Sequence, residues 1–384
     1  MDIVNNLATG FAAAASLQNL FFCLVGCLLG TLIGVLPGIG PVATIAMLLP
    51  VTYGMPPLAS LIMLAGIYYG AQYGGSTTSI LVNLPGEVSS VVTTLDGHQM
   101  AKQGRAGAAL ATTALGSFFA GCVGTLMLVA FAPALGSLSE KFTSVEYFSL
   151  MALGLVSAVV LAQGSLVKAF AMIFAGLLLG LVGTDVNTGT ARFTFGVSEL
   201  FDGIGFLPVV MGLFGINEVI NNLEKPEERD VAYAQIDRLW LTKEEFRQAW
   251  PASVRGTFLG SILGILPGGG VVLASFASYV IEKRLAADPS RFGRGAIEGV
   301  SGPESANNSA AQTSFIPLLT LGIPSNVVMA LMMGAMIIHG ITPGAAVMEK
   351  RPDLFWGMVA SMWIGNLMLV IINLPMIGIW VKLL

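Results

Sequence analysis

Long apolar stretches, two of them interrupted by a Leu-Pro-Gly turn, constrain this chain more than any other feature. A membrane-spanning helix takes about 20 apolar residues, and we count roughly eight to eleven such stretches, depending on how interrupted ones are scored. Only 10% of the 384 residues are charged, whereas soluble domains carry about 25%. The sequence therefore predicts an all-α polytopic membrane protein and, because it has no basic tract, no nucleic-acid partner.

The two interrupted stretches resemble each other. Residues 30–40 read GTLIGVLPGIG, and residues 260–270 read GSILGILPGGG. Further along, residues 83–86 (NLPG) fall opposite 322–325 (GIPS), and residues 100–102 (MAK) opposite 348–350 (MEK). Three landmarks in one order predict an internal duplication. Chance similarity between Gly-rich helices is the alternative.

Basic residues indicate that the two copies are inverted. Lys and Arg are enriched in cytoplasmic loops, and the second break is flanked by Arg255, Lys283 and Arg284, whereas the first has none nearby. Two re-entrant helical hairpins that open on opposite sides of the membrane would give this pattern, which is the inverted-repeat arrangement of secondary transporters. A long broken span fits the same residues.

This duplication divides the chain into three parts. We expect residues 1–135 to form the first repeat, with its hairpin and polar cluster, and residues 251–384 to form the second. Residues 136–250 are then connecting or scaffold helices and a cytoplasmic loop.

The Pro-Gly breaks are candidate substrate sites. Non-helical backbone persists inside a membrane only where protein or a watered cavity satisfies its amides, and free N–H groups at a helix start favour an anion. The candidate substrate-binding residues at the breaks are Pro37, Gly38, Gly40, Pro267, Gly268 and Gly270. A kink made for helix packing is the alternative, and we prefer it for Gly30, Gly34, Gly260 and Gly264.

Two dense polar clusters supply the other candidates. Hydroxyls and amides can donate to a carboxylate, and with freed carbonyls they suit a small hard cation such as sodium. Single Ser and Thr residues in membrane helices usually bond back to their own helix, which is the competing interpretation. From these clusters we assign Ser76, Thr77, Thr78, Asn307 and Asn308 to the substrate, and Asn83, Ser305, Thr320, Ser325 and Asn326 to the ion.

Few other groups offer chemistry. Glu304 adjoins the second cluster and Glu87 follows the first, and an ionisable residue at depth indicates a functional site, unless both lie in water at a hairpin mouth. His98 and His339 form no ligand or triad pattern, and Cys23 and Cys27 are more typical of helix packing than of a zinc site, which needs four ligands. We therefore expect no enzyme, no catalytic residue and no metal beyond sodium.

On the repeated breaks, residues 304–309 and residues 322–325, the chain resembles the large membrane subunit of the tripartite tricarboxylate transporters, the TctA type. The resemblance implies a multi-pass protein of the bacterial inner membrane. It implies as partners a small membrane subunit (TctB-type) and a periplasmic solute-binding protein (TctC-type) that delivers citrate or another carboxylate. Uptake would be coupled to an ion gradient, usually sodium, through an elevator-like movement, often in a homodimer.

One departure from that family concerns length. Its members are typically longer, and this chain stops at Leu384 directly after an apolar span, so the family's C-terminal helices are expected to be absent from this sequence. A passive carboxylate channel and a non-transporting structural membrane subunit are the alternative functions.

Overall fold

The computed structural model describes most of the chain. The described residues are 3–36, 40–139, 141–143, 165–185, 190–201, 239–266 and 270–383, with short pieces at 145–146, 148–149, 151–152, 155, 203–204, 209, 212 and 220. Much of the expected connecting part, 136–250, therefore lies outside them.

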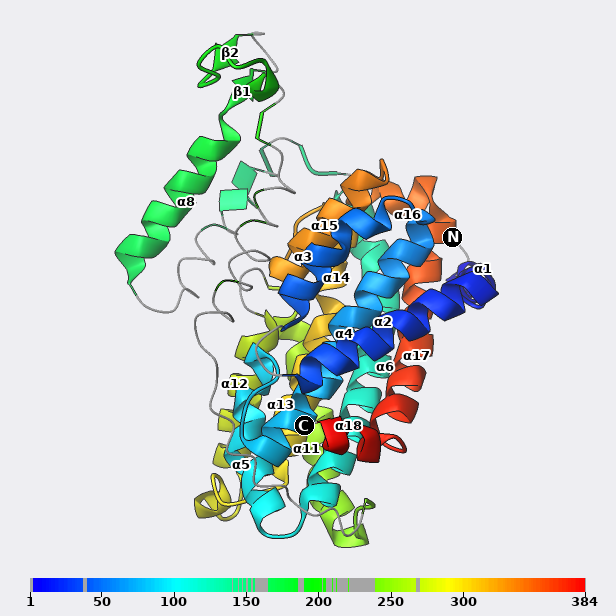
Figure 1. Cartoon of the computed structure of the whole chain (residues 1–384), viewed down its shortest axis with the longest axis vertical. Coiled ribbons are helices and arrows are strands. Elements are labelled where there is room, and N and C mark those ends of the chain that lie inside the picture. The colour runs from blue at the N-terminus through cyan, green and yellow to red at the C-terminus, as the bar shows by residue number, and fades with distance from the viewer. Residues whose placement is uncertain are drawn as a thin grey trace.

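The described part is almost entirely helical (Figure 1). A two-residue ribbon is its only sheet, in which Gly183 pairs with Arg192 and Thr184 with Ala191 in antiparallel register. The N-terminal helices are α1 (Ile3–Ala14), α2 (Leu17–Val35), α3 (Gly40–Thr52), α4 (Pro57–Val82), η1 (Val88–Ser90), α5 (Val91–Lys102) and α6 (Ala106–Ser139). Then follow α8 (Leu166–Gly180), β1 (Gly183–Thr184), β2 (Ala191–Arg192) and η2 (Ser198–Leu200). The C-terminal helices are α11 (Lys243–Leu263), α12 (Gly270–Leu285), η4 (Pro289–Arg291), α13 (Glu298–Thr313), α14 (Phe315–Leu321), α15 (Val327–Ile338), α16 (Ala346–Lys350), α17 (Pro352–Asn373) and α18 (Ile377–Leu383).

Glycines bring α2 and α4 into backbone contact. A Cβ built on Gly30 would lie 2.4 Å from the carbonyl oxygen of Ile67, and one on Gly34 2.5 Å from that of Ala71. From the other side, a Cβ on Gly74 would lie 2.3 Å from the carbonyl oxygen of Thr31. Because no side chain fits between them, the two helices pack along their whole shared length, as small residues allow in membranes.

The pair α11 and α13 packs in the same way. A Cβ on Gly256 would lie 2.2 Å from the carbonyl oxygen of Gly302, and one on Gly260 2.1 Å from that of Ala306. Gly264 likewise approaches Ala310, at 2.4 Å. The expectation that Gly30, Gly34, Gly260 and Gly264 serve packing is confirmed.

Helices α6 and α17 join these pairs. Along α6, Gly116 lies against Ser305 and Gly124 against Ser309, so α13 packs closely on it. In α17, Gly365 faces the sulfur atoms of Cys23 and Cys27, which are buried in α2. These cysteines therefore fill space between two helices, as the sequence suggested.

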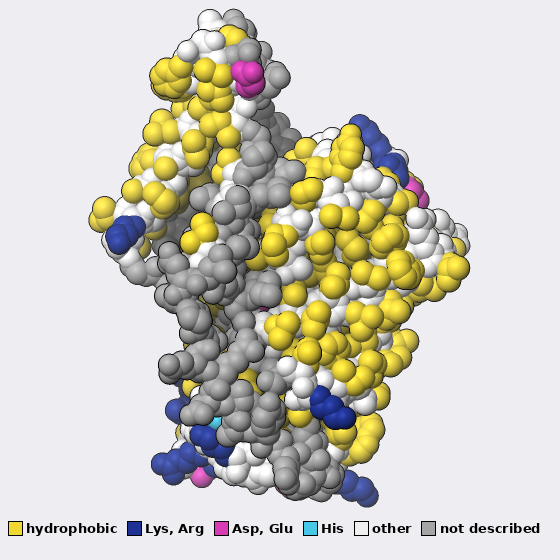
Figure 2. All heavy atoms as spheres, viewed as in Figure 1, with side chains coloured by type: hydrophobic (Ala, Val, Ile, Leu, Met, Phe, Trp, Pro, Cys, Tyr) yellow, Lys and Arg dark blue, Asp and Glu magenta, His cyan; other side chains and the backbone are white. Residues whose placement is uncertain are grey.

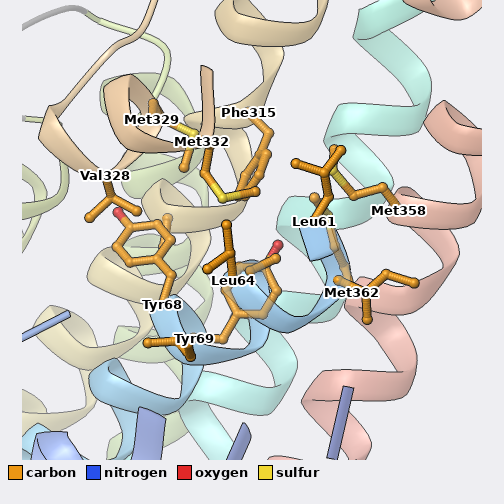
Figure 3. Packing of buried hydrophobic residues seen from close by; sticks show 14 of the residues in the cluster. Leu61, Leu64, Tyr68, Tyr69, Phe315, Val328, Met329, Met332, Met358 and Met362 are labelled. Carbon is orange, nitrogen blue, oxygen red and sulfur yellow. The ribbon is translucent and has the colours of Figure 1, made fainter. Parts of the chain in front are cut away.

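The buried core lies where α4 meets α14, α15 and α17 (Figure 3). Tyr69 and Phe315 are neighbours there, with ring centroids 6.1 Å apart. Leu61 points toward Met358 and Met362 of α17, and Tyr68 toward Val328 of α15. This core fixes α4, and with it the polar residues in its C-terminal half.

The outer surface suits lipid. Figure 2 shows apolar side chains covering much of the visible face of the helical body, with Lys and Arg gathered toward its two ends. Within the described residues, three helices are long and apolar enough to cross a membrane, namely Leu17–Val35, Ala106–Leu138 and Pro352–Asn373. Shorter apolar helices accompany them, so the predicted all-α membrane protein is confirmed at this level.

One element boundary differs from the expected division of the chain. Helix α11 begins at Lys243, inside the stretch assigned to the connecting part, because Thr242 and Glu245 form a capping box there. The second polar cluster lies in one helix, residues 298–313, which is buried from Gly299 onward. The first polar cluster, residues 72–79, lies within α4 without a break.

Candidate functional site

Glu304 is the centre of a polar network between the two polar clusters. Its carboxylate accepts a hydrogen bond of 2.6 Å from the Ser76 hydroxyl of α4 and another from Thr93 of α5. The Asn307 amide, one turn along α13, donates to it at 3.3 Å. Glu304 is 0% exposed, so it is enclosed by protein rather than exposed to water.

Asn308 extends this network toward α6. Its amide nitrogen lies 2.8 Å from the Ser117 hydroxyl and 2.5 Å from the Asn307 side-chain oxygen, and it donates to the Glu304 backbone carbonyl at 3.0 Å. The structure therefore brings Ser76, Asn307 and Asn308 together in one hydrogen-bonded network. It adds Thr93 and Ser117, which the sequence missed because both lie outside the dense clusters.

A second carboxylate, Glu87, packs against α4 at Gly75. A Cβ on Gly75 would lie 3.0 Å from its Cγ atom. The Ser89 hydroxyl bonds to the Glu87 carboxylate and lies 2.9 Å from the side-chain oxygen of Gln72. Glu87 is half-buried at the start of η1, so it is less enclosed than Glu304.

Thr78 ties the first break to the polar helix. Its hydroxyl lies 2.7 Å from the Val35 carbonyl and 3.3 Å from the Gly34 carbonyl, which are among the free acceptors at the end of α2. Thr78 therefore caps a helix end, and its proton is not available to a substrate. Thr77, the preceding residue, is buried and hydrogen-bonds to no described side chain.

The breaks themselves are described only at their edges. Gly40 begins α3 with φ of +62°, a conformation that favours glycine, and a Cβ there would meet nothing within 4 Å. Gly270 begins α12 and is buried against Leu263 and Gly264. Pro37, Gly38, Pro267 and Gly268 lie outside the described residues.

The network contains a carboxylate without a basic partner among the described residues. Among the described residues, no Lys or Arg forms an ion pair with Glu304. A buried carboxylate is stable as an anion only when hydrogen bonds or a cation compensate for its lost hydration. The hydroxyls and amides of the network supply hydrogen bonds to the carboxylate. The many oxygen atoms of the network make cation binding possible.

A family model described as "Tripartite tricarboxylate transporter TctA family" matches residues 20–384. The chain belongs to this family. An uncharacterized 52.8 kDa protein of Agrobacterium vitis, placed by its description in the TAR-I ttuC' 3'region, is 62% identical over 384 residues, 100% of this chain and 76% of that protein. Another from that organism, in the TAR-II ttuC' 3'region, is 71% identical over 125 residues, 33% of this chain and 52% of that one. No solved structure matches.

Membership of the TctA family indicates the general function of the chain. The chain is a membrane subunit of a tripartite tricarboxylate transporter and not an enzyme. The family's tripartite organisation implies TctB- and TctC-type partners in general. The glutamate network described above therefore lies in the interior of a TctA-family membrane subunit.

Three of the residues assigned to the ion hydrogen-bond to backbone in this TctA-family chain, and a fourth ends a helix. Asn83 ends α4 in the left-handed conformation, with φ of 59°, and is exposed. Thr320 bonds back to Ile316 at 2.7 Å, Ser325 donates to Ser314 at 3.1 Å, and Asn326 caps α15 by accepting from Met329 at 3.0 Å. The four residues lie at helix ends and turns, and only Thr320 bonds back to its own helix, so their assignment to the ion stays a prediction.

Ser305 differs from those four. Its hydroxyl is buried without a hydrogen-bond partner among the described residues, and a Cβ on Gly116 of α6 would lie 2.9 Å from it. It lies one residue beyond Glu304, on the face of α13 that packs on α6.

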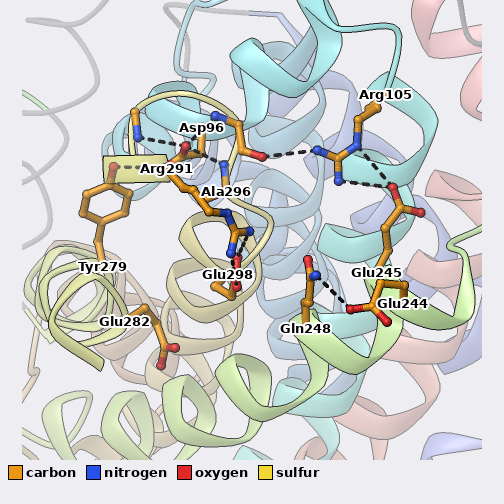
Figure 4. Close-up of polar contacts among 12 residues, drawn as sticks. Asp96, Arg105, Glu244, Glu245, Gln248, Tyr279, Glu282, Arg291, Ala296 and Glu298 are labelled. Atoms are coloured by element: carbon orange, nitrogen blue, oxygen red, sulfur yellow. Dashed lines mark hydrogen bonds and ion pairs between the residues drawn. The ribbon is translucent and has the colours of Figure 1, made fainter. Parts of the chain in front are cut away.

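The sequence did not predict the hydrogen bonds that Asp96 makes. One of its carboxylate oxygens accepts hydrogen bonds from the backbone N–H groups of Gly293 at 2.9 Å, and of Gly295 and Ala296 at 2.8 Å (Figure 4). The other accepts from the Tyr279 hydroxyl at 2.9 Å. This contact ties α5 to the loop before α13, and no pattern near Asp96 could show it, because its partners are backbone groups almost 200 residues away.

Proposed function

We propose that the chain is the large transmembrane subunit of a secondary active, cation-coupled uptake system for tricarboxylates or other small carboxylates. The observation that carries the proposal is the buried carboxylate of Glu304, held by Ser76 of α4 and Thr93 of α5. A buried ionisable group inside a membrane protein is costly and marks an ion or substrate path. A network that spans both polar clusters can sense a cation and a substrate together.

Inverted repeats are part of this proposal. In support, the glycine contacts of α2 with α4 and of α11 with α13 follow the same spacing. The C-caps of α4 and α14 are also alike, since Asn83 and Gly322 have φ of 59° and 69°. The inversion itself rests on the basic residues that flank only the second break.

A further pair of similar helix ends changes which residues correspond in the proposed duplication. Gly104 and Gly340 have φ of +75° and +68°. Each is followed by a backbone bond that reaches back, from Arg105 to Met100 at 2.8 Å and from Ile341 to Met336 at 2.9 Å. The proposal therefore pairs Met100 with Met336, in place of Met348, which belongs to the short helix α16.

Sodium is the coupling ion in this proposal. Oxygen atoms dominate the network, and carbonyl or hydroxyl oxygens near broken helices are typical sodium ligands in transporters. The substrate would bind at the breaks, where helix starts near Pro41 and Val271 offer N–H groups. No described basic residue contacts the network to neutralise a carboxylate substrate, so the bound cation would supply part of that charge.

The remaining parts of the proposal concern the setting. A small membrane subunit and a periplasmic solute-binding protein would work with this chain in the bacterial inner membrane, and the binding protein would deliver citrate or another carboxylate. An elevator-like movement, in a homodimer, would carry the site across.

Uptake of radiolabelled carboxylates tests the proposal. Cells carrying all three subunits should accumulate one acid above its external concentration, and omission of sodium should abolish the accumulation. Equilibration without accumulation would identify a passive channel instead. Accumulation that is independent of sodium but sensitive to a protonophore would replace sodium by protons.

A further inference from the structure

A small polar hollow lies beside the glutamate network, between α4, α6 and α17. Its polar lining is Tyr73, Ser76, Thr77, Thr113, Ser117 and Asn373. Two of these residues belong to the network already described, since Ser76 donates to Glu304 and Ser117 contacts Asn308. None of the residues assigned to the ion from the sequence lines the hollow.

Three of the five hydroxyl groups that line this hollow have their protons engaged elsewhere. Ser76 donates to Glu304 at 2.6 Å, Thr113 to the Leu110 carbonyl at 2.9 Å, and Tyr73 to the Asn366 side-chain oxygen at 3.3 Å. A hydroxyl whose single proton is engaged has only lone pairs left to offer. These three groups therefore present acceptors to the hollow, which suits a cation and not a carboxylate.

Asn373 supplies a further acceptor. Its amide nitrogen donates to Thr31 at 3.2 Å and to the Leu369 carbonyl at 3.0 Å. Its side-chain oxygen is buried and has no partner among the described residues, and the residue is 5% exposed. Buried polar atoms are nearly always paired, so this oxygen points to a ligand.

The size of the hollow also favours a cation over a carboxylate. The hollow has room for about one particle the size of a water molecule, which is too small for a carboxylate of several heavy atoms. A monovalent cation bound there would be one hydrogen bond away from the Glu304 charge, through Ser76. Burial of a cation is far less costly beside such a carboxylate.

We propose that this hollow is the binding site of the coupling cation, a dehydrated sodium ion whose ligands include oxygens of Ser76, Thr113, Tyr73 and Asn373, with Glu304 as the compensating charge. The inference rests on the proposed cation-coupled function. Under this proposal Ser76 and Thr77 belong to the ion site, and no longer to the substrate site to which the sequence assigned them.

Sodium binding to the purified full chain tests the site directly. Calorimetric titration with sodium chloride, against choline chloride as the blank, should give saturable binding in the wild type. Thr113→Val and Asn373→Leu should each weaken that binding by about tenfold or more, because each removes one ligand oxygen. Wild-type affinity in both variants would overturn the proposal.

Thr125→Val is the matched control. Thr125 is also buried in α6 and bonds back to its own helix, to Gly121 at 2.8 Å, but does not line the hollow. Its variant should bind sodium as the wild type does, and melting temperatures of all three variants show whether they are folded. Equal weakening in Thr125→Val would overturn the assignment to the hollow.

The same titration separates this inference from the proposed function. Sodium-dependent accumulation in cells, together with no saturable sodium binding to the purified chain, would mean that the hollow holds a structural water only. That result overturns the site and leaves the transport proposal standing. Sodium binding that is lost in Thr113→Val, in a protein whose uptake ignores sodium, would overturn the transport proposal instead.

Discussion

Ser76 donates a hydrogen bond of 2.6 Å to the Glu304 carboxylate, although 228 positions separate the two residues along the chain. The bond joins α4 to α13, and with them the two polar clusters that the sequence placed in separate halves. Because the carboxylate is fully buried, its charge depends on the donors around it.

Glu304→Gln should strongly impair uptake. The amide removes the negative charge, and hydrogen bonds to a charged group are worth about 1.5–3 kcal/mol each, so uptake should fall by at least about tenfold. Initial uptake rates of the radiolabelled carboxylate that the wild type accumulates, normalised to the amount of protein in the membrane, measure the effect.

The matched control for that variant is Glu298→Gln. Glu298 lies in the first turn of the same helix but pairs at 3.0 Å with Arg291, near the surface. Surface ion pairs contribute little, so this variant should transport normally. Similar losses in both variants would argue against a special role for Glu304.

Gly30→Ala and Gly260→Ala should destabilise the protein. Their Cβ atoms would lie 2.4 Å from the Ile67 carbonyl oxygen and 2.1 Å from the Ala306 carbonyl oxygen. Overpacking of this kind costs about 1–3 kcal/mol, so the melting temperature in detergent should drop. Gly176→Ala in α8 is the control, because its Cβ would meet nothing within 4 Å. A fall in its melting temperature as large would count against the close packing.

Gly38→Val and Gly268→Val should abolish uptake while leaving membrane insertion intact. A branched side chain at either position would cover the backbone N–H groups that we expect to face the substrate. Uptake assays and quantitative blots of membrane fractions distinguish lost transport from lost protein. Normal uptake by both variants would remove the breaks from the mechanism.

Substitutions at Asp96 should form a graded series. Asp96→Ala leaves three backbone N–H groups without their acceptor, at a cost of at least about 3 kcal/mol. Asp96→Asn keeps an oxygen that can accept from them and should cost less. Tyr279→Phe removes only one hydroxyl and should cost about 1 kcal/mol. Thermal unfolding in detergent gives the order, and an Asp96→Ala protein as stable as the wild type would contradict it.

The sequence predicted the helical membrane class because composition and apolar length depend on few assumptions. Gly30 and Gly260 could be assigned to packing because small residues at four-residue spacing have one common use in membranes. Ser76, Asn307 and Asn308, which share the buried network, could be singled out because dense polar residues in an apolar chain are costly without partners.

Other parts of the site could not be predicted from the sequence. Thr93 and Ser117 are single hydroxyls, and nothing nearby separates them from residues that bond to their own helix. Asp96 binds backbone N–H groups of a distant loop, and Asn373 is one polar residue in a long apolar helix. Asn83 and Asn326 were assigned to an ion because the residue types fit, but the same side chains also suit helix ends.

The glycine contacts have a consequence for how movement could be followed. Helix α2, which leads into the first break, cannot slide or separate from α4 without losing backbone contact along three turns. Spectroscopic labels on these two helices should therefore report one constant separation throughout the cycle. Labels that span the Ser76 and Glu304 helices are the ones to watch, since their contact is made by side chains that can exchange partners.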